Sequence, residues 1–188
     1  MSAARDISHM HPFGPKSKYV NAIIETPKGS RTKFKYDAEH GMFMFDKALP
    51  IGQSFPYDFG FLPSTQGDDG DPLDVLVLTD EPTFTGCLIH AKLLGVIEAE
   101  QTEDGKTERN DRLIATPIEV KSGKPPAGAI ERLEPDLVRN ISNFFAVYNE
   151  LQGRRFKTLR SAGPEPAEKL IRTGMSNFQK RLRKRSQR

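Results

Sequence analysis

Residues 69–74 read Asp69-Gly70-Asp71-Pro72-Leu73-Asp74, and the apolar run Val75-Leu76-Val77-Leu78 follows directly. A short apolar run after a group of turn residues predicts a buried strand. The three carboxylates therefore stand at the mouth of that strand. At about 5 Å apart, each ionised pair would repel by roughly 3 kcal/mol at an effective dielectric near 20. Such a loop needs either full solvation or a cation.

Oxygen ligands of high charge density favour a hard divalent ion, Mg²⁺ before Mn²⁺ or Ca²⁺. The plain alternative is a solvated acidic turn that binds nothing, because Asp, Gly and Pro are common turn residues. A calcium-binding EF-hand loop does not fit. Counted from Asp69, Asp74 stands where that loop needs glycine, and Asp80 stands where it needs a bidentate glutamate.

The length of 188 residues fits one domain that buries roughly two thirds of the surface exposed by its unfolded chain. A single cysteine, Cys87, excludes an internal disulfide framework. Residues 1–20 lack the apolar stretch of a secretory signal, and no apolar run approaches the ~18 residues of a membrane span. We therefore expect a cytoplasmic protein without a membrane segment.

The net charge of +3 is unevenly distributed, because residues 180–188 carry six basic and no acidic side chains. The rest of the chain has 22 basic and 25 acidic residues, a net charge of −3. A basic end can contact nucleic acid or anionic lipid, but it is also typical of a solvated helix end. We expect a flexible arm over residues 1–17, one domain over 18–179 and a basic tail over 180–188.

Short segments with strand character, separated by turn residues, occupy the first two thirds of the chain and predict a small β-barrel. They are 19–26, 33–37, 42–45, 58–62, 73–79, 88–98 and 112–116. An apolar stripe at helical spacing then runs from Pro135 to just before Gly153, and a second begins near Pro166 and is weakened by Gly174. The expected fold class is α+β, a barrel with two packed C-terminal helices.

Several segments of the chain, by their sequence, order and spacing, resemble the soluble, family I inorganic pyrophosphatases. The stretch 69–75 matches the signature of that family at every position, and Glu25-Thr26-Pro27-Lys28-Gly29 with Lys33 matches its first strand pair. Segments 94–97, 113–115 and 144–148 extend the resemblance, which covers roughly residues 19–150.

The resemblance implies a five-stranded OB-like β-barrel with flanking helices. It also implies Mg²⁺-dependent hydrolysis of inorganic diphosphate to two orthophosphates, by direct attack of a metal-activated water and without a phosphoenzyme. Divalent cations suit this reaction because they cancel phosphate charge and supply hydroxide near neutral pH. A homo-oligomer, hexamer or dimer, is expected as well.

By the same resemblance, Asp69 and Asp74 ligate metal, with Asp74 bridging two ions, and Asp71 acts as the base toward the attacking water. Glu25 is expected to orient metal-bound water, although a glutamate at a strand end can also be plain surface. Four side chains are expected to bind phosphate groups: Lys33, Lys47, Arg112 and Tyr148. Lys33 could instead face solvent, and Tyr148 could simply complete the apolar helix stripe.

The chain departs from the family pattern at the site. Lys47 replaces an arginine, and Arg112 replaces a lysine. In the longer segment 98–112, simple alignment puts Gln101 and Asn110 where the family has two further metal-ligating aspartates. A shift of register by one residue would bring Asp111, or Glu100, into one of these places, but such a slip also changes the face of the strand.

The main hypothesis is therefore a divergent Mg²⁺-dependent diphosphatase with fewer or weaker metal sites. The alternative is a catalytically weakened protein on the same fold that binds metal and phosphate compounds without turnover. Nucleic-acid binding predicts aromatic residues interleaved with basic ones. The aromatic segment 55–61 contains no Lys or Arg and leads into the acidic stretch. Nucleic acid is thus an unlikely partner.

Overall fold

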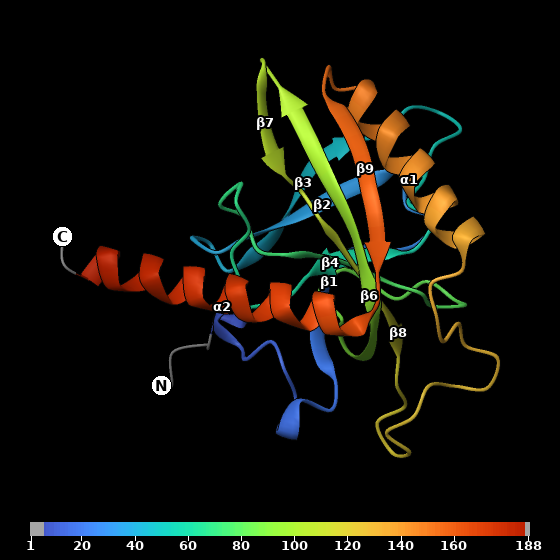
Figure 1. Cartoon of the computed structure of the whole chain (residues 1–188), viewed down its shortest axis with the longest axis vertical. Helices are drawn as coiled ribbons and strands as arrows, with labels where there is room; N and C mark the ends of the chain where they lie inside the picture. The colour runs from blue at the N-terminus through green and yellow to red at the C-terminus, as the bar shows by residue number, and fades with distance from the viewer. Residues whose placement is uncertain (1–5, 187–188) are drawn as a thin grey trace.

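The computed structural model describes residues 6–186, and sheet dominates the chain up to the first long helix (Figure 1). The strands are β1 (Val20–Thr26), β2 (Thr32–Asp37), β3 (Met42–Ala48), β4 (Asp58–Phe61), β5 (Asp74–Val77), β6 (Leu88–Glu103), β7 (Lys106–Arg109), β8 (Arg112–Pro117) and β9 (Arg155–Ala162). Two long helices, α1 (Pro135–Glu150) and α2 (Pro164–Ser186), lie in the C-terminal third. The predicted α+β class is confirmed.

Five strands close into a ring in the order β1-β4-β5-β8-β6, because the long strand β6 pairs with β8 and also returns to β1. The β5–β8 pair is parallel, and the other pairs of the ring are antiparallel. The predicted five-stranded closed sheet is thereby confirmed.

Within this ring, strand β5 pairs with β4 on one side and with β8 on the other. Val75, Leu76 and Val77 are fully buried, as expected for a strand covered on both faces. Strands β1 and β4 approach so closely that a Cβ on Gly60 would lie 1.9 Å from the carbonyl oxygen of Ile23. Only glycine fits at that position.

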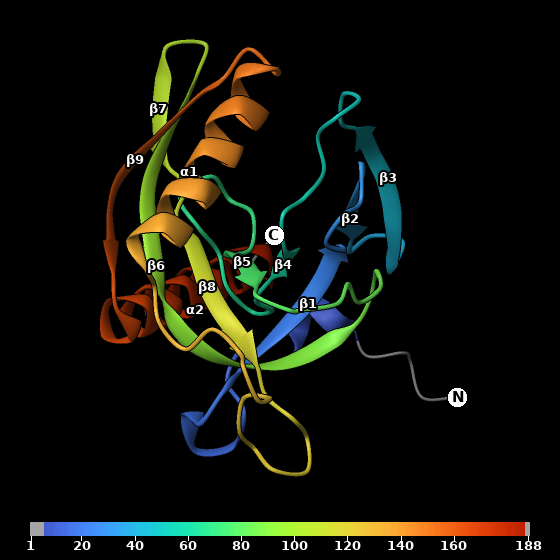
Figure 2. The same ribbon diagram turned by 90° about the vertical axis from the view of Figure 1, so that its right-hand side faces the viewer.

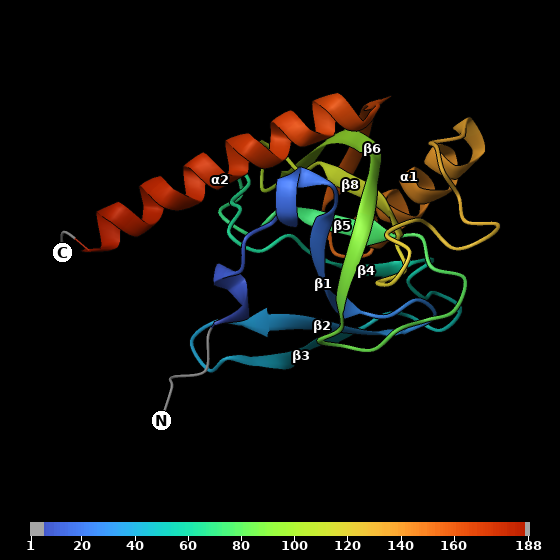
Figure 3. The same cartoon turned by 90° about the horizontal axis from the view of Figure 1, so that it is seen from below.

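The hairpin β2–β3 is a separate two-stranded sheet. Figure 3 shows it on one side of the ring, with α2 on the opposite side. Its strands carry the predicted phosphate-binding residues Lys33 and Lys47, which are directly paired across the hairpin. The hairpin therefore brings two positive charges to the same region of the molecule.

Helix α1 lies against the ring of strands (Figure 2). Its buried apolar residues belong to a core cluster that also includes Phe55 and Phe59. Pro135 begins the helix at a position where its missing N–H is not needed. The buried residues of the helix include Leu137, Ile141, Phe145 and Tyr148. This packing fixes where the Tyr148 hydroxyl can reach.

Helix α2 begins at Pro164, two residues before the expected start, and continues through the predicted basic tail as far as Ser186. Gly174 lies inside it because the helix presses on Leu73, whose Cδ1 would be 2.8 Å from a Cβ at that position. The last two residues of the predicted tail lie outside the described part of the chain. Within residues 6–186 no helix is long and apolar enough to cross a membrane.

Two strands were not predicted. The β6–β7 hairpin turns at Asp104-Gly105, where both residues have positive φ. Such a dipeptide is a strong hairpin signal, but the flanking residues are too polar to suggest strands. Strand β9 pairs along the far half of β6 and buries only Phe156, so its sequence lacks an apolar face.

The predicted N-terminal arm, over its described residues 6–17, forms two short 3₁₀ turns, η1 (Ile7–His9) and η2 (Pro15–Ser17). Backbone hydrogen bonds connect it to the domain, from Ser64 N to Ser8 O and from Asn21 N to Pro12 O. Residues 1–5 of the predicted arm lie outside the described residues.

Candidate active site

The acidic stretch forms a tight turn before β5, and we call residues 68–74 the acid loop. Gly70 adopts a positive φ of 87°, and the Gly67 amide donates to the Asp71 carbonyl at 2.8 Å. The Asp71 amide donates to Oδ1 of Asp69 at 3.1 Å. The loop is supported from below by Thr65, whose hydroxyl accepts from the Leu73 amide at 3.0 Å. Its carboxylates are thus held on a defined backbone.

On the exposed side of the loop, which we call its outer end, Oδ2 of Asp71 forms an ion pair with Nζ of Lys35 at 2.8 Å. Both side chains are about half exposed, at 58% and 51% respectively. Partial desolvation, together with the negative charges of Asp74 and Asp71, raises the pKa of Asp69 to about 6. Lys35 was not among the predicted site residues, although its period-two spacing from Lys33 puts it on the same face of β2.

At the inner end, Oδ2 of Asp74 lies 2.8 Å from Nη1 of Arg112. The Arg112 side chain is only 5% exposed and that of Asp74 is 25% exposed. The guanidinium stacks 4.6 Å from the ring centre of Phe145. Burial raises the pKa of Asp74, and the positive charge of Arg112 opposes this shift. The predicted metal ligand and the predicted phosphate ligand therefore contact each other.

Lys33 has its Nζ 5.8 Å from the ring centres of Phe59 and Tyr148 and 3.5 Å from Oδ2 of Asp46. Burial lowers the pKa of this ammonium, but the neighbouring Tyr148, Asp74 and Asp46 outweigh that effect and raise it overall. Lys33 therefore stays charged. Lys47, its partner in the hairpin, donates to Oε1 of Gln152 at 2.6 Å.

The Tyr148 hydroxyl is buried and makes no well-formed hydrogen bond within residues 6–186. It interacts with Lys33, whose pKa it raises, and a tyrosine hydroxyl has capacity for a further hydrogen bond from a ligand or an ordered water. Its neighbour Lys33 is a cation. The vacant hydrogen-bonding capacity of Tyr148 and the charge of Lys33 together suit an oxyanion.

Glu25 lies near the end of β1 and is only 7% exposed, so it is not a surface residue. Its Oε1 accepts from the Tyr36 amide at 2.7 Å. Burial raises the pKa of Glu25 to about 7, an effect that the Tyr36 hydrogen bond opposes. The side chain thus ionises near neutral pH.

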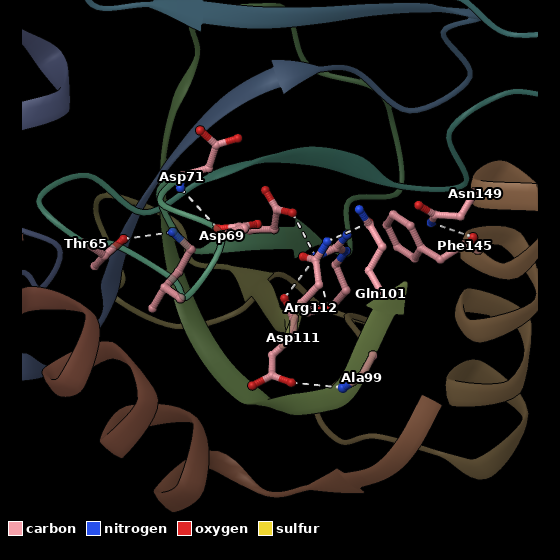
Figure 4. Close-up of polar contacts among 12 residues, drawn as sticks. Thr65, Asp69, Asp71, Ala99, Gln101, Asp111, Arg112, Phe145 and Asn149 are labelled. Carbon is pink, nitrogen blue, oxygen red and sulfur yellow. Dashed lines mark hydrogen bonds and ion pairs between the residues drawn. The ribbon is translucent and has the colours of Figure 1, made fainter. Parts of the chain in front are cut away.

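Asp111 is held in a different way. Its Oδ1 accepts from the Ala99 amide at 2.9 Å and lies 2.8 Å from Arg109. Figure 4 shows this carboxylate directed toward Ala99, on the opposite side of the site from Asp71. Next to Asp111 in the chain, Asn110 donates its Nδ2 to Oε1 of Gln101 at 2.8 Å.

The structure thus brings most of the predicted residues to one end of the ring, but they do not all point into one common site. Asp69, Asp74, Asn110 and Asp111 line a cavity of about 260 Å³ that α2 closes with Leu170, Thr173 and Gly174. Within the described residues, no three Asp, Glu, His or Cys side chains are arranged as they would be around a metal ion. The oxygen donors of Asp69, Asp71 and Asp74 suit a hard divalent cation, while Lys35 and Arg112 compete for two of them.

A ring of strands with a carboxylate loop at its mouth, and with lysines and a buried tyrosine hydroxyl nearby, suits an enzyme that acts on a phosphate compound with the help of a divalent cation. A sequence model of inorganic pyrophosphatases matches residues 22–179. The chain belongs to the inorganic pyrophosphatase family.

Curated relatives agree over most of their length. The chain is 40% identical over 165 residues to an inorganic pyrophosphatase of Nanoarchaeum equitans, covering 86% of this chain and 98% of that one. It is 38% identical over 156 residues to that of Geobacillus stearothermophilus, covering 83% and 92%. The crystal structure of the Thermus thermophilus inorganic pyrophosphatase matches with a TM-score of 0.80 at 26% identity, covering 93% and 99%.

Proposed function

We propose that this inorganic pyrophosphatase uses Mg²⁺ to hydrolyse diphosphate to two orthophosphates, with the acid loop as its metal-binding element. The observation that supports this assignment is the opposition of charges across the mouth of the ring. Lys35 lies 2.8 Å from Asp71, and Lys33 is close enough to Asp74 for that carboxylate to raise the pKa of the ammonium. A diphosphate–metal complex needs both signs of charge within one site.

The acid loop supplies hard oxygen donors, from Asp69 at its outer end and from Asp74 at its inner end. A bound divalent cation lowers the pKa of coordinated water and neutralises phosphate charge. Asp71 is 58% exposed and has a displaceable partner, Lys35. We assign it to accept the proton of the attacking water, with Glu25 orienting water from the buried end of β1.

The phosphate groups are assigned to Lys33, Lys47 and Tyr148. Lys33 and Lys47 lie opposite each other in the β2–β3 hairpin, and Tyr148 offers a buried hydroxyl beside Lys33. Lys47 must release Gln152 to reach a phosphate. Arg112 contributes its positive charge from below, through Asp74.

The test is orthophosphate release from diphosphate with and without Mg²⁺, for the wild type and for Asp71→Asn. Asp80→Asn is the matched control, because Asp80 is an exposed aspartate outside the acid loop with no assigned role. Many turnovers that require Mg²⁺, persist in Asp80→Asn and fall sharply in Asp71→Asn support the proposal. Binding of Mg²⁺ and diphosphate without turnover would establish the alternative, a catalytically weakened binding protein.

A homo-oligomer, dimer or hexamer, is part of the proposal. The β2–β3 region exposes apolar side chains that a second copy could cover, including Met42, Met44, Phe45 and Phe84. Mass photometry of the wild type and of Phe45→Ser tests this assignment, since a lower assembly state in the variant would locate the interface. A cytoplasmic location also stays a prediction, and cell fractionation tests it.

A further inference from the structure

The inner end of the acid loop already contains a cation, the guanidinium of Arg112. Its Nη1 lies 2.8 Å from Oδ2 of Asp74, and it also contacts the carbonyl oxygens of Asn110 and Asp111 at 3.2 and 3.1 Å. The guanidinium lies over the rings of Phe145 and Phe156, with its centre 4.6 and 5.5 Å from theirs. A guanidinium keeps its charge when it is buried and stacks on aromatic rings, so this position suits arginine better than lysine.

A pair of neutral amides lies beside this cation. Asn110 donates its Nδ2 to Oε1 of Gln101 at 2.8 Å, and its Oδ1 accepts from Nη1 of Arg112. The two contacts fix the orientation of the Asn110 amide, because Arg112 can only donate. Both oxygens of the pair are thus engaged by N–H donors, and neither carries the charge that attracts a divalent ion.

The strands hold these residues in register. Val75 of β5 pairs with Leu113 of β8, which puts Asp74 next to Arg112 at the ends of two parallel neighbours. The backbone N–H of Asn110 donates to the Ala99 carbonyl at 2.9 Å, which anchors the pair of side-chain amides to β6. The arrangement is therefore part of the sheet and not of a mobile loop.

We propose that Arg112 is a built-in cation that takes the place of a divalent ion at the inner face of Asp74. Asp74 keeps its Oδ2 on the guanidinium, and it would share in holding one divalent cation together with Asp69. Without diphosphate, the site binds a single divalent ion, and Arg112 acts as a positioning residue for Asp74. This inference rests on the proposed function, because it concerns the metal site of that reaction.

The outer pair shows why only one end stays open to metal. Lys35 and Asp71 are half exposed, and Lys35 is a flexible ammonium that water can take over when a divalent ion binds. Arg112 is enclosed by two aromatic rings and by backbone carbonyls, and its side chain is only 5% exposed. A divalent ion can displace Lys35 but not Arg112.

The experiment counts Mg²⁺ per chain by titration calorimetry without diphosphate, and Mn²⁺ by electron paramagnetic resonance. The variants are Arg112→Met, which removes the internal cation, and the double variant Gln101→Asp with Asn110→Asp, which restores charge to the amide pair. Lys35→Met is the matched control, since it removes the outer cation. Circular dichroism reports whether each variant is folded.

We expect a single ion in the wild type and in Lys35→Met, with severalfold tighter binding in the latter, and a second ion in Arg112→Met. Two or more ions in the wild type, or an unchanged single ion in folded Arg112→Met, would overturn the inference. If Arg112→Met does not fold, the double variant decides, because it retains Arg112: an unchanged single ion supports the inference and a second ion overturns it. Absent turnover with one ion bound contradicts the proposed function alone, whereas no binding at all contradicts both.

Discussion

Two ion pairs lie at the two ends of the acid loop, and they differ in the medium around them. Lys35–Asp71 and Arg112–Asp74 have the same N–O distance of 2.8 Å. The first is half exposed, so its net contribution to stability is about 0–1 kcal/mol. The second is largely enclosed, and removing one partner leaves a poorly solvated charge. Equal distances thus describe a replaceable contact at one end and a structural one at the other.

The largest expected effect comes from Asp74→Ala. It should abolish nearly all hydrolysis and lower the free energy of unfolding by about 3 kcal/mol, because the Arg112 guanidinium loses its carboxylate in a site with little water. Asp71→Ala is the matched variant and should cost less than about 1 kcal/mol. Urea unfolding of both proteins in a chelator measures the difference, and equal losses of stability would remove the distinction between the two pairs.

Asp71→Asn should affect catalysis far more than metal binding or folding. Loss of a general base lowers turnover by about 10²–10⁴-fold, while the stability and the Mg²⁺ affinity should change little because Asp71 is 58% exposed. Steady-state phosphate release and calorimetric Mg²⁺ titration are the two measurements. A parallel drop in both would assign Asp71 to ligation of the metal instead.

Glu25 extends the comparison to pH, because it is a buried carboxylate that accepts from the Tyr36 amide. Its folded-state pKa of about 7 exceeds the ordinary 4.5 because of burial. Below about pH 4.5, Glu25 is protonated in both the folded and the unfolded state, so its ionisation does not affect stability. Between pH 4.5 and 7 the free energy of unfolding falls as the pH rises. Above about pH 7 the loss of stability is constant, at about 3 kcal/mol at most.

Glu25→Gln should remove this slope and stabilise the protein at pH 8, measured by urea unfolding in a chelator. Glutamine keeps an oxygen for the Tyr36 amide. Glu39→Gln, at an exposed position, is the control. Parallel stability profiles of Glu25→Gln and wild type between pH 4.5 and 8 would contradict the assigned pKa.

The smallest expected effect concerns Arg181 of α2, which donates to the Gly70 carbonyl at 3.1 Å and so touches the acid loop from outside. Arg181→Ala should weaken Mg²⁺ affinity only a fewfold, because one exposed hydrogen bond contributes about 1 kcal/mol. Arg183→Ala, an exposed neighbour on the same helix, is the control. Identical Mg²⁺ titrations for both variants would show that the loop does not depend on this contact.

Some of this architecture was predictable from local sequence. The acid loop stands at the mouth of the buried strand β5, as the run of turn residues before Val75 indicated. The apolar stripe of α1 was equally predictable, because helical spacing of apolar residues is a local signal. Strand β9 was not legible, because pairing with β6 forms it and only Phe156 is buried.

The site divides along the same line. The sequence by itself determined which charged residues gather at the candidate site, three carboxylates in one turn and lysines at period two, because a few neighbouring residues fix those spacings. Only the tertiary structure decided which charges meet. Asp74 contacts Arg112 because β5 and β8 run parallel in register, and Asp71 contacts Lys35 because the β2–β3 hairpin lies across the mouth of the ring. Burial then made the first pair permanent and left the second exchangeable, and burial is a property of the whole fold.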